Sequence, residues 1–143
     1  MARIPLDQDP SADEMIIPSD LAAAKVSEQR ILGEIEQHNY SEVSRFAVKL
    51  ALEEAITNAI KHGNRNDPTK HITIRFRVTP EETVIWLTDE GNGFDPTSVP
   101  DPTLDENLSK PNGRGIMLMR AYMDEVSFGQ AGRQVRLVKL NRG

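Results

Sequence analysis

The sequence contains no cysteine, so disulfide bonds, zinc sites built on thiolates and thiol catalysis are all excluded. It also lacks any apolar run near the roughly 18 residues that a membrane-spanning helix needs. The first residues contain no apolar signal core. An excess of positive charge is absent too, since the net charge is −5, which argues against broad binding to nucleic acid or anionic membrane. We therefore expect a cytoplasmic protein.

The 143 residues correspond to one domain, with 38% hydrophobic and 27% charged residues, as is typical of soluble proteins. Residues 1–13 are polar, and we expect a flexible arm there, followed by a single domain over residues 14–143. Helical periodicity predicts two helices, from 21 to about 37 and from 42 to 63. Short apolar runs and alternation predict strands over 14–18, 71–79, 83–89, 124–128 and 135–140. This order predicts an α/β two-layer sandwich, with a mixed, mostly antiparallel sheet and helices on one face.

Residues 50–63, LALEEAITNAIKHG, are the segment around which the rest of the chain is organised. The composition predicts helix, and Lys61 and His62 suit its last turn, with Gly63 as the residue that ends it. This explains His62 structurally, and we do not expect it to be catalytic. One face of the helix stays apolar to the end and can pack on a core, through Leu52, Ala55, Ile56, Ala59 and Ile60.

Glu54 and Asn58 project from another face of this helix, one turn apart. The oxygen of an asparagine is a hard neutral ligand that suits Mg²⁺, and a neighbouring glutamate can orient a nucleophile and accept its proton. From this helix alone, simple exposure to solvent explains both residues as well.

Residues 89–95, DEGNGFD, follow a predicted strand. Gly91 and Gly93 permit a tight turn and the close approach of a flat ligand, and the Asp89 carboxylate can accept a hydrogen bond from an exocyclic amino group. An ordinary loop with glycines at positive φ is the alternative.

Residues 96–112 form the longest irregular stretch and contain four prolines. A loop of this length in a compact domain is usually functional and often a lid, although a disordered insertion is the alternative. Gly113, Arg114 and Gly115 then open a helix, where exposed backbone N–H groups and the helix dipole favour phosphate. The Walker motif and the catalytic motifs of eukaryotic-type protein kinases are missing from the sequence.

Three motifs in this order resemble the GHKL ATP-binding superfamily, also called the Bergerat fold, over about residues 14–141. EAITNAIKHG resembles its N box, DEGNGFDP its first glycine box and GRGIMLMRAYMDEVSF its second. Within the superfamily, the likeness is closest to the anti-sigma factor serine kinases of bacterial partner-switching systems.

The resemblance implies ATP and Mg²⁺ as cofactors and a role for each motif residue. Glu54 matches the general base and Asn58 the Mg²⁺ ligand, while Asp89 matches the residue that binds the adenine amino group. The remaining matches are Gly91 and Gly93 beneath the adenine, and Gly113, Arg114 and Gly115 around the phosphates. One departure is that Gly132-Arg133-Gln134-Val135 stands where the family often has G-T-x-V, whose threonine assists adenine recognition.

The function that the resemblance implies is an ATP-dependent serine kinase that acts as an anti-sigma factor. It would phosphorylate a serine of an antagonist protein, hold a sigma factor or analogous effector, and form a homodimer. Neither nucleic acid nor membrane is an expected partner. The alternative is an ATP-gated protein-binding module without physiological phosphotransfer.

Overall fold

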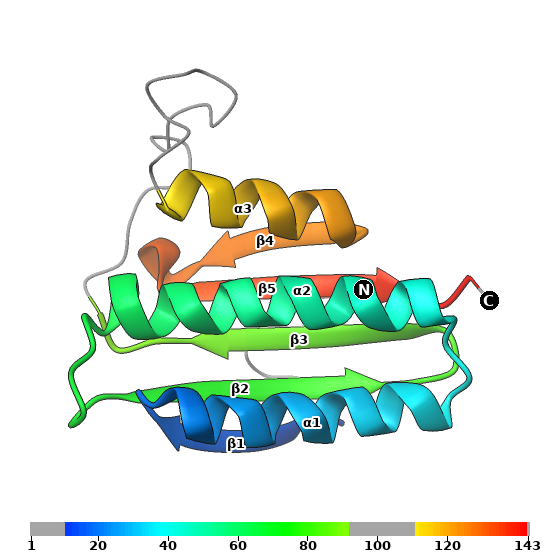
Figure 1. Ribbon diagram of the computed structural model, residues 1–143, viewed down its shortest axis with the longest axis horizontal. Coiled ribbons are helices and arrows are strands. Elements are labelled where there is room, and N and C mark those ends of the chain that lie inside the picture. Colours follow the sequence, from blue (N-terminus) through cyan, green and yellow to red (C-terminus); the bar gives the residue numbers. More distant parts are fainter. Residues whose placement is uncertain (1–10, 92–110, 143) are drawn as a thin grey trace, which may run out of the picture.

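The computed structural model describes residues 11–91 and 111–142, with the backbone alone for 111–114 (Figure 1). The elements are β1 (Asp13–Pro18), α1 (Leu21–Gln37), α2 (Glu42–Asn58), the π-helical turn η1 (Ala59–Gly63), β2 (His71–Val78), β3 (Glu82–Thr88), α3 (Pro111–Tyr122), β4 (Glu125–Gly129), the 3₁₀ turn η4 (Gln130–Gly132) and β5 (Gln134–Leu140). The arm predicted for residues 1–13 and the lid predicted for 96–112 lie almost entirely outside the described residues.

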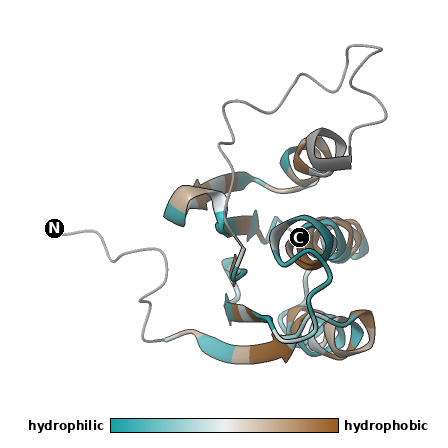
Figure 2. Ribbon diagram, turned by 90° about the vertical axis from the view of Figure 1, so that its left-hand side faces the viewer, coloured by the Kyte–Doolittle hydropathy of each residue, from teal (hydrophilic) through white to brown (hydrophobic). Residues whose placement is uncertain are grey.

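The sheet contains five strands in the order β1-β2-β3-β5-β4, and every strand pairing in the described residues is antiparallel. Strands β2 and β3 form an antiparallel hairpin, in which Ile74 lies opposite Leu87. Helices α1, α2 and α3 lie on one face of this sheet (Figure 1), and a view turned by 90° shows the sheet and the helices as two layers (Figure 2). The predicted α/β two-layer sandwich is confirmed.

The core lies between the sheet and the helices because alternation in the strands turns one set of side chains toward them. On β2, Ile72, Ile74 and Phe76 are at most 1% exposed. From the helical layer, Ile31 of α1 and Leu52 of α2 are fully buried in the same cluster. Side chains that alternate along the strand therefore pack against side chains that recur about every 3.6 residues along the helices.

Each of the first two helices begins at a capping side chain. Asp20 Oδ1 accepts hydrogen bonds from the N–H groups of Ala22 and Ala23, and Ser41 Oγ accepts one from Ser44 N–H. Such side chains satisfy N–H groups that the first turn leaves without a partner. None of the helices in the described stretches is long and apolar enough to cross a membrane.

The end of the central helix differs from the prediction. Helix α2 passes into the π-helical turn η1, where Asn64 N–H donates to Ala59 O, five residues back, at 2.7 Å. Gly63 is the last residue of this turn, so the helical run ends there as predicted, but Gly63 does not adopt the positive φ that is common for a glycine at a helix end. Helix α3 also starts earlier than predicted, at Pro111 rather than at Gly113.

Candidate functional site

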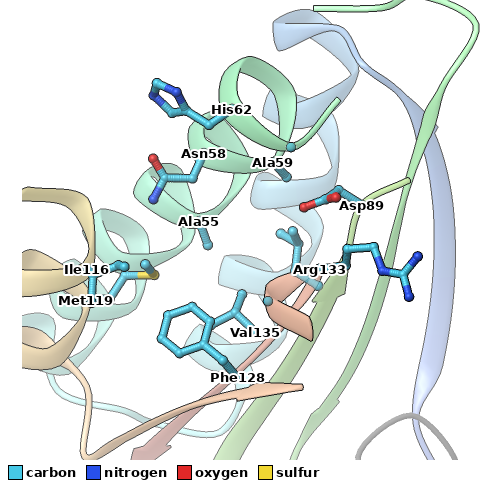
Figure 3. A pocket seen from close by; sticks show the side chains of 13 residues that line it. Ala55, Asn58, Ala59, His62, Asp89, Ile116, Met119, Phe128, Arg133 and Val135 are labelled. Carbon is cyan, nitrogen blue, oxygen red and sulfur yellow. The ribbon is translucent and has the colours of Figure 1, made fainter. Parts of the chain in front are cut away.

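A cavity of about 160 Å³ lies between α2, α3 and the sheet (Figure 3). Its wall is mostly apolar, formed by Ala55, Ala59, Leu87, Ile116, Met119, Phe128 and Val135. Polar side chains and glycines complete the lining, namely Asn58, His62, Gly63, Asp89, Gly132 and Arg133. Because a cavity of about 150 Å³ can hold a benzene ring, this one has room for an aromatic ring of about that size.

Asp89 directly follows β3 and points its carboxylate into this cavity (Figure 3). Its N–H donates to Arg133 O at 3.0 Å, and its Oδ1 accepts a hydrogen bond from Gly91 N–H at 2.8 Å. Burial raises the pKa of Asp89, while the Gly91 N–H, Arg133 and Lys70 partly oppose this rise. The side chain is therefore a fixed hydrogen-bond acceptor at the end of an apolar pocket.

Gly63 and Gly91 make the close packing around Asp89 possible. A Cβ atom on Gly63 would overlap the Asp89 carboxylate, with Oδ1 only 2.8 Å away. A Cβ atom on Gly91 would lie 2.6 Å from the carbonyl carbon of Gly63. Sequence reasoning assigned Gly63 only to the end of a helix, yet its place next to Asp89 makes it part of the site. Gly93 lies outside the described residues.

Glu54 and Asn58 of α2 meet Gly115 of α3 at the other end of the site. A Cβ atom on Gly115 would lie 2.8 Å from Asn58 Nδ2 and 3.2 Å from Glu54 Oε2. The structure thus brings together residues from two motifs that lie more than 50 positions apart. Gly113 and Arg114 lie in the first turn of α3, which places their backbone at the same end of the helix.

Two groups of lining residues were missed by sequence reasoning. His62 was assigned to the helix dipole alone, but its side chain lies beside Asn58 at the rim of the cavity (Figure 3). Met119 and Phe128 form part of the apolar wall, and the Arg120 guanidinium lies over the Phe128 ring at 5.9 Å. Met119 is an apolar residue of α3, and only the assembled fold shows that it faces a cavity.

The oxygen donors at the α3 end fit a magnesium ion bound with phosphate. Asn58 offers an amide oxygen, a hard neutral ligand that suits Mg²⁺, and the Glu54 carboxylate lies beside Gly115 as Asn58 does. The described residues contain no group of three or more histidine, aspartate or glutamate side chains able to hold a metal. One or two protein oxygens suffice for Mg²⁺ where phosphates and waters supply the rest.

The arrangement as a whole can bind a molecule with a flat base and an anionic tail. The Asp89 end offers an acceptor within an apolar slot, and the α3 end offers backbone N–H groups at a helix N-terminus. A carboxylate and an amide stand beside that helix end, where the anionic tail would lie.

Comparison with known proteins agrees with this geometry. A family model described as a histidine kinase-like ATPase domain matches residues 17–139. The serine-protein kinase RsbW of Bacillus subtilis is 29% identical over 139 residues, which cover 91% of this chain and 86% of that protein. RsbW of Bacillus licheniformis is 38% identical over 55% of this chain and 53% of its own length. The serine/threonine-protein kinase BtrW of Bordetella bronchiseptica is 31% identical over 59% of this chain and 61% of its own length.

Proposed function

This chain belongs to the histidine kinase-like ATPase domain family, and from its site we propose that it is an ATP-dependent protein serine kinase. The family membership expected from the three motifs is confirmed by the match over residues 17–139. The observation that carries the proposal is the meeting of Gly115, Asn58 and Glu54 at one end of a pocket whose other end holds Asp89. Relatives of this chain are named serine-protein kinases, which supports serine as the acceptor.

In this proposal, the adenine of ATP enters the apolar pocket with its amino group toward Asp89. The carboxylate accepts the hydrogen bond, and the missing side chains of Gly63 and Gly91 keep this end of the pocket open. Arg133, at the position where the family often has threonine, lines the same end, so adenine is read here without that hydroxyl. The phosphates then extend toward the N-terminus of α3.

At the phosphate end, Asn58 would hold a magnesium ion, which when bound neutralises charge on the phosphate oxygens. Glu54 lies one turn before Asn58 and is positioned to accept the proton of an incoming serine hydroxyl. The serine oxygen bonds to the terminal phosphorus while the bond to the ADP oxygen breaks, and the hydroxyl proton passes to Glu54. The free backbone N–H groups in the first turn of α3, at Asn112 and Gly113, would stabilise charge on the transferred group.

The proposed activity also requires protein partners. We infer that the acceptor is an anti-sigma antagonist protein, that a sigma factor or analogous effector is held, and that the chain works in the cytoplasm as a homodimer. The surface of β1 and α1 offers apolar side chains for such contacts, since Ile16, Leu21 and Val26 are each at least 59% exposed. Light scattering of the purified chain measures its molar mass and so tests the dimer. A mass equal to that of the monomer would contradict it.

The first experiment is calorimetry of ATP binding in the presence of Mg²⁺. Asn58→Ala and Asp89→Ala are compared with the wild type, and both are expected to lose most of the affinity. If the wild type fails to bind ATP, the proposed function is wrong.

The second experiment measures transfer of the labelled terminal phosphate to a purified antagonist protein from a related RsbW system. Glu54→Ala should keep ATP binding and lose transfer. Glu53→Ala is the matched control, because the Glu53 carboxylate lies 3.8 Å from Lys25 Nζ on the α1 side of the same helix. Equal transfer by Glu54→Ala and the wild type would contradict the role of Glu54. If the wild type binds ATP but transfers no phosphate, the alternative function, an ATP-gated protein-binding module, is favoured.

A further inference from the structure

Asn64 is a fully buried polar side chain just beyond the π-helical turn. Its Nδ2 donates to Ser19 Oγ at 2.9 Å and to the carbonyl oxygen of His71 at 3.0 Å. Its Oδ1 accepts a hydrogen bond from Glu90 N–H at 2.8 Å. One amide thus ties together the residue before the α1 cap, the start of β2 and the segment after β3.

The contact with Glu90 matters because Glu90 follows Asp89. Three successive N–H groups are held in this segment: that of Asp89 by Arg133 O, that of Glu90 by Asn64 Oδ1, and that of Gly91 by Asp89 Oδ1. The first contact continues the sheet, and the third lies within the segment itself. Asn64 therefore provides the one contact of the three that comes from a side chain outside the segment.

We propose that Asn64 is a positioning residue for base recognition. Its Oδ1 holds the Glu90 amide, and this fixes the direction in which the Asp89 carboxylate meets the amino group of a purine. The hydrogen bonds donated by Nδ2 stabilise the fold, whereas the one accepted by Oδ1 determines the preference for the base. This inference rests on the proposed function, because it requires the base of ATP in the pocket.

The test compares the affinities for ATP and inosine triphosphate, each with Mg²⁺, by calorimetry. Inosine triphosphate has a carbonyl oxygen where ATP has the amino group, so wild-type protein should prefer ATP by about tenfold to a hundredfold, the usual range for a hydrogen bond to a charged group. Asn64→Ala should lose most of this preference. Asn64→Asp keeps an acceptor for Glu90 N–H and loses the donors, so it should retain the preference even where its stability falls.

Ser19→Ala is the matched control, because it removes a partner of Nδ2 and leaves the contact of Oδ1 with Glu90 intact. Ser19→Ala should prefer ATP over inosine triphosphate to the same degree as the wild type. If Asn64→Ala does not fold, Asn64→Ser replaces it, since the shorter hydroxyl side chain cannot span the distance to Glu90.

The outcomes separate the two claims. Wild-type protein that binds neither nucleotide would overturn the proposed function and this inference with it. Wild-type preference for ATP that persists in the alanine or serine variant would overturn the positioning role alone. Loss of the preference in both Asn64→Ala and Ser19→Ala would also overturn it, because general loosening of the fold would then explain the effect.

Discussion

Gly115 of α3 lies so close to Asn58 of α2 that a Cβ atom on the glycine would be 2.8 Å from the Asn58 amide nitrogen. With a side chain at position 115, the Asn58 amide and the Glu54 carboxylate would have to leave their present positions. Sequence reasoning valued this glycine for its backbone N–H near phosphate. The structure adds a second requirement, which is room for the two polar side chains of α2.

Gly115→Ala should reduce Mg²⁺-dependent ATP binding and phosphate transfer at least tenfold, because the new methyl group displaces Asn58 and Glu54. The fold should survive, since alanine inside a helix gains about 0.5–1 kcal/mol over glycine. Calorimetry and thermal unfolding measure the two effects. Gly33→Ala in α1 is the control, because no atom lies within 4 Å of its added Cβ, and it should raise stability without changing ATP binding. Wild-type affinity in Gly115→Ala would contradict this account.

Gly91→Ala should lower the free energy of unfolding by about 1–3 kcal/mol, the usual effect of overpacking. Its Cβ would meet the backbone carbonyl of Gly63, which cannot swing aside as a flexible side chain would. Urea unfolding measures the change. A free energy within about 0.5 kcal/mol of the wild type, as at an ordinary surface site, would show that the turn adapts.

Asp89→Asn should raise stability at neutral pH while it weakens ATP binding. Burial raises the pKa of Asp89 above its ordinary value of 3.8, so the folded state holds this proton more tightly than the unfolded chain does. The stability that Asp89 contributes is thus complete below its unfolded pKa and is lost as the pH rises through the folded pKa. The melting temperature of Asp89→Asn should exceed that of the wild type at pH 7 and converge with it below pH 3.8. If the two melting temperatures instead converged as the pH rose, the predicted direction of the pH dependence would be wrong.

Glu28 on α1, away from the site, should also make the stability of the protein depend on pH. Its side chain is buried, its Oε1 has no hydrogen-bond partner among the described residues, and Lys25 Nζ is 3.9 Å away. Burial, and then the neighbouring Glu53, raise the pKa of Glu28 above 4.5.

Glu28→Gln should therefore stabilise the protein at pH 7 by about 1 kcal/mol, the usual scale of single substitutions, and this gain should disappear as the pH falls toward 4.5. Urea unfolding across this pH range measures it. Glu36→Gln is the control on the same helix, since the Glu36 side chain is 71% exposed. A gain at Glu36 equal to that at Glu28 would point to net charge rather than burial.

The sequence alone predicted the features that depend on neighbouring residues. The alternating strand residues and the apolar face of α2 follow from local chemistry, and the structure contains both. Motif order also identified the family and paired Glu54 with Asn58.

Features that depend on distant partners could not be predicted in this way. The sequence around Asn64 does not reveal its contacts, because its partners Ser19 and Glu90 lie 45 and 26 positions away. The role of Gly63 depends on Asp89 in another element, and the apolar wall of the pocket needs α3, β4 and β5 in place. An extra residue in a helical turn leaves no mark on composition, so the π-helical turn was missed as well.

That turn has a consequence for insertions and deletions in this region. Residues Ala59–Gly63 are wound with one residue more than an α-helical turn would use. Because the π-helical turn absorbs an extra residue, losing one residue here would restore α-helical winding and leave the residues that follow facing nearly as before. A deletion in the regular part of α2 would instead rotate the residues that follow by about 100° about the helix axis, and His62 and Gly63 would then leave the cavity together. The π-helical turn is therefore the place where this helix can lose a residue without moving the binding site.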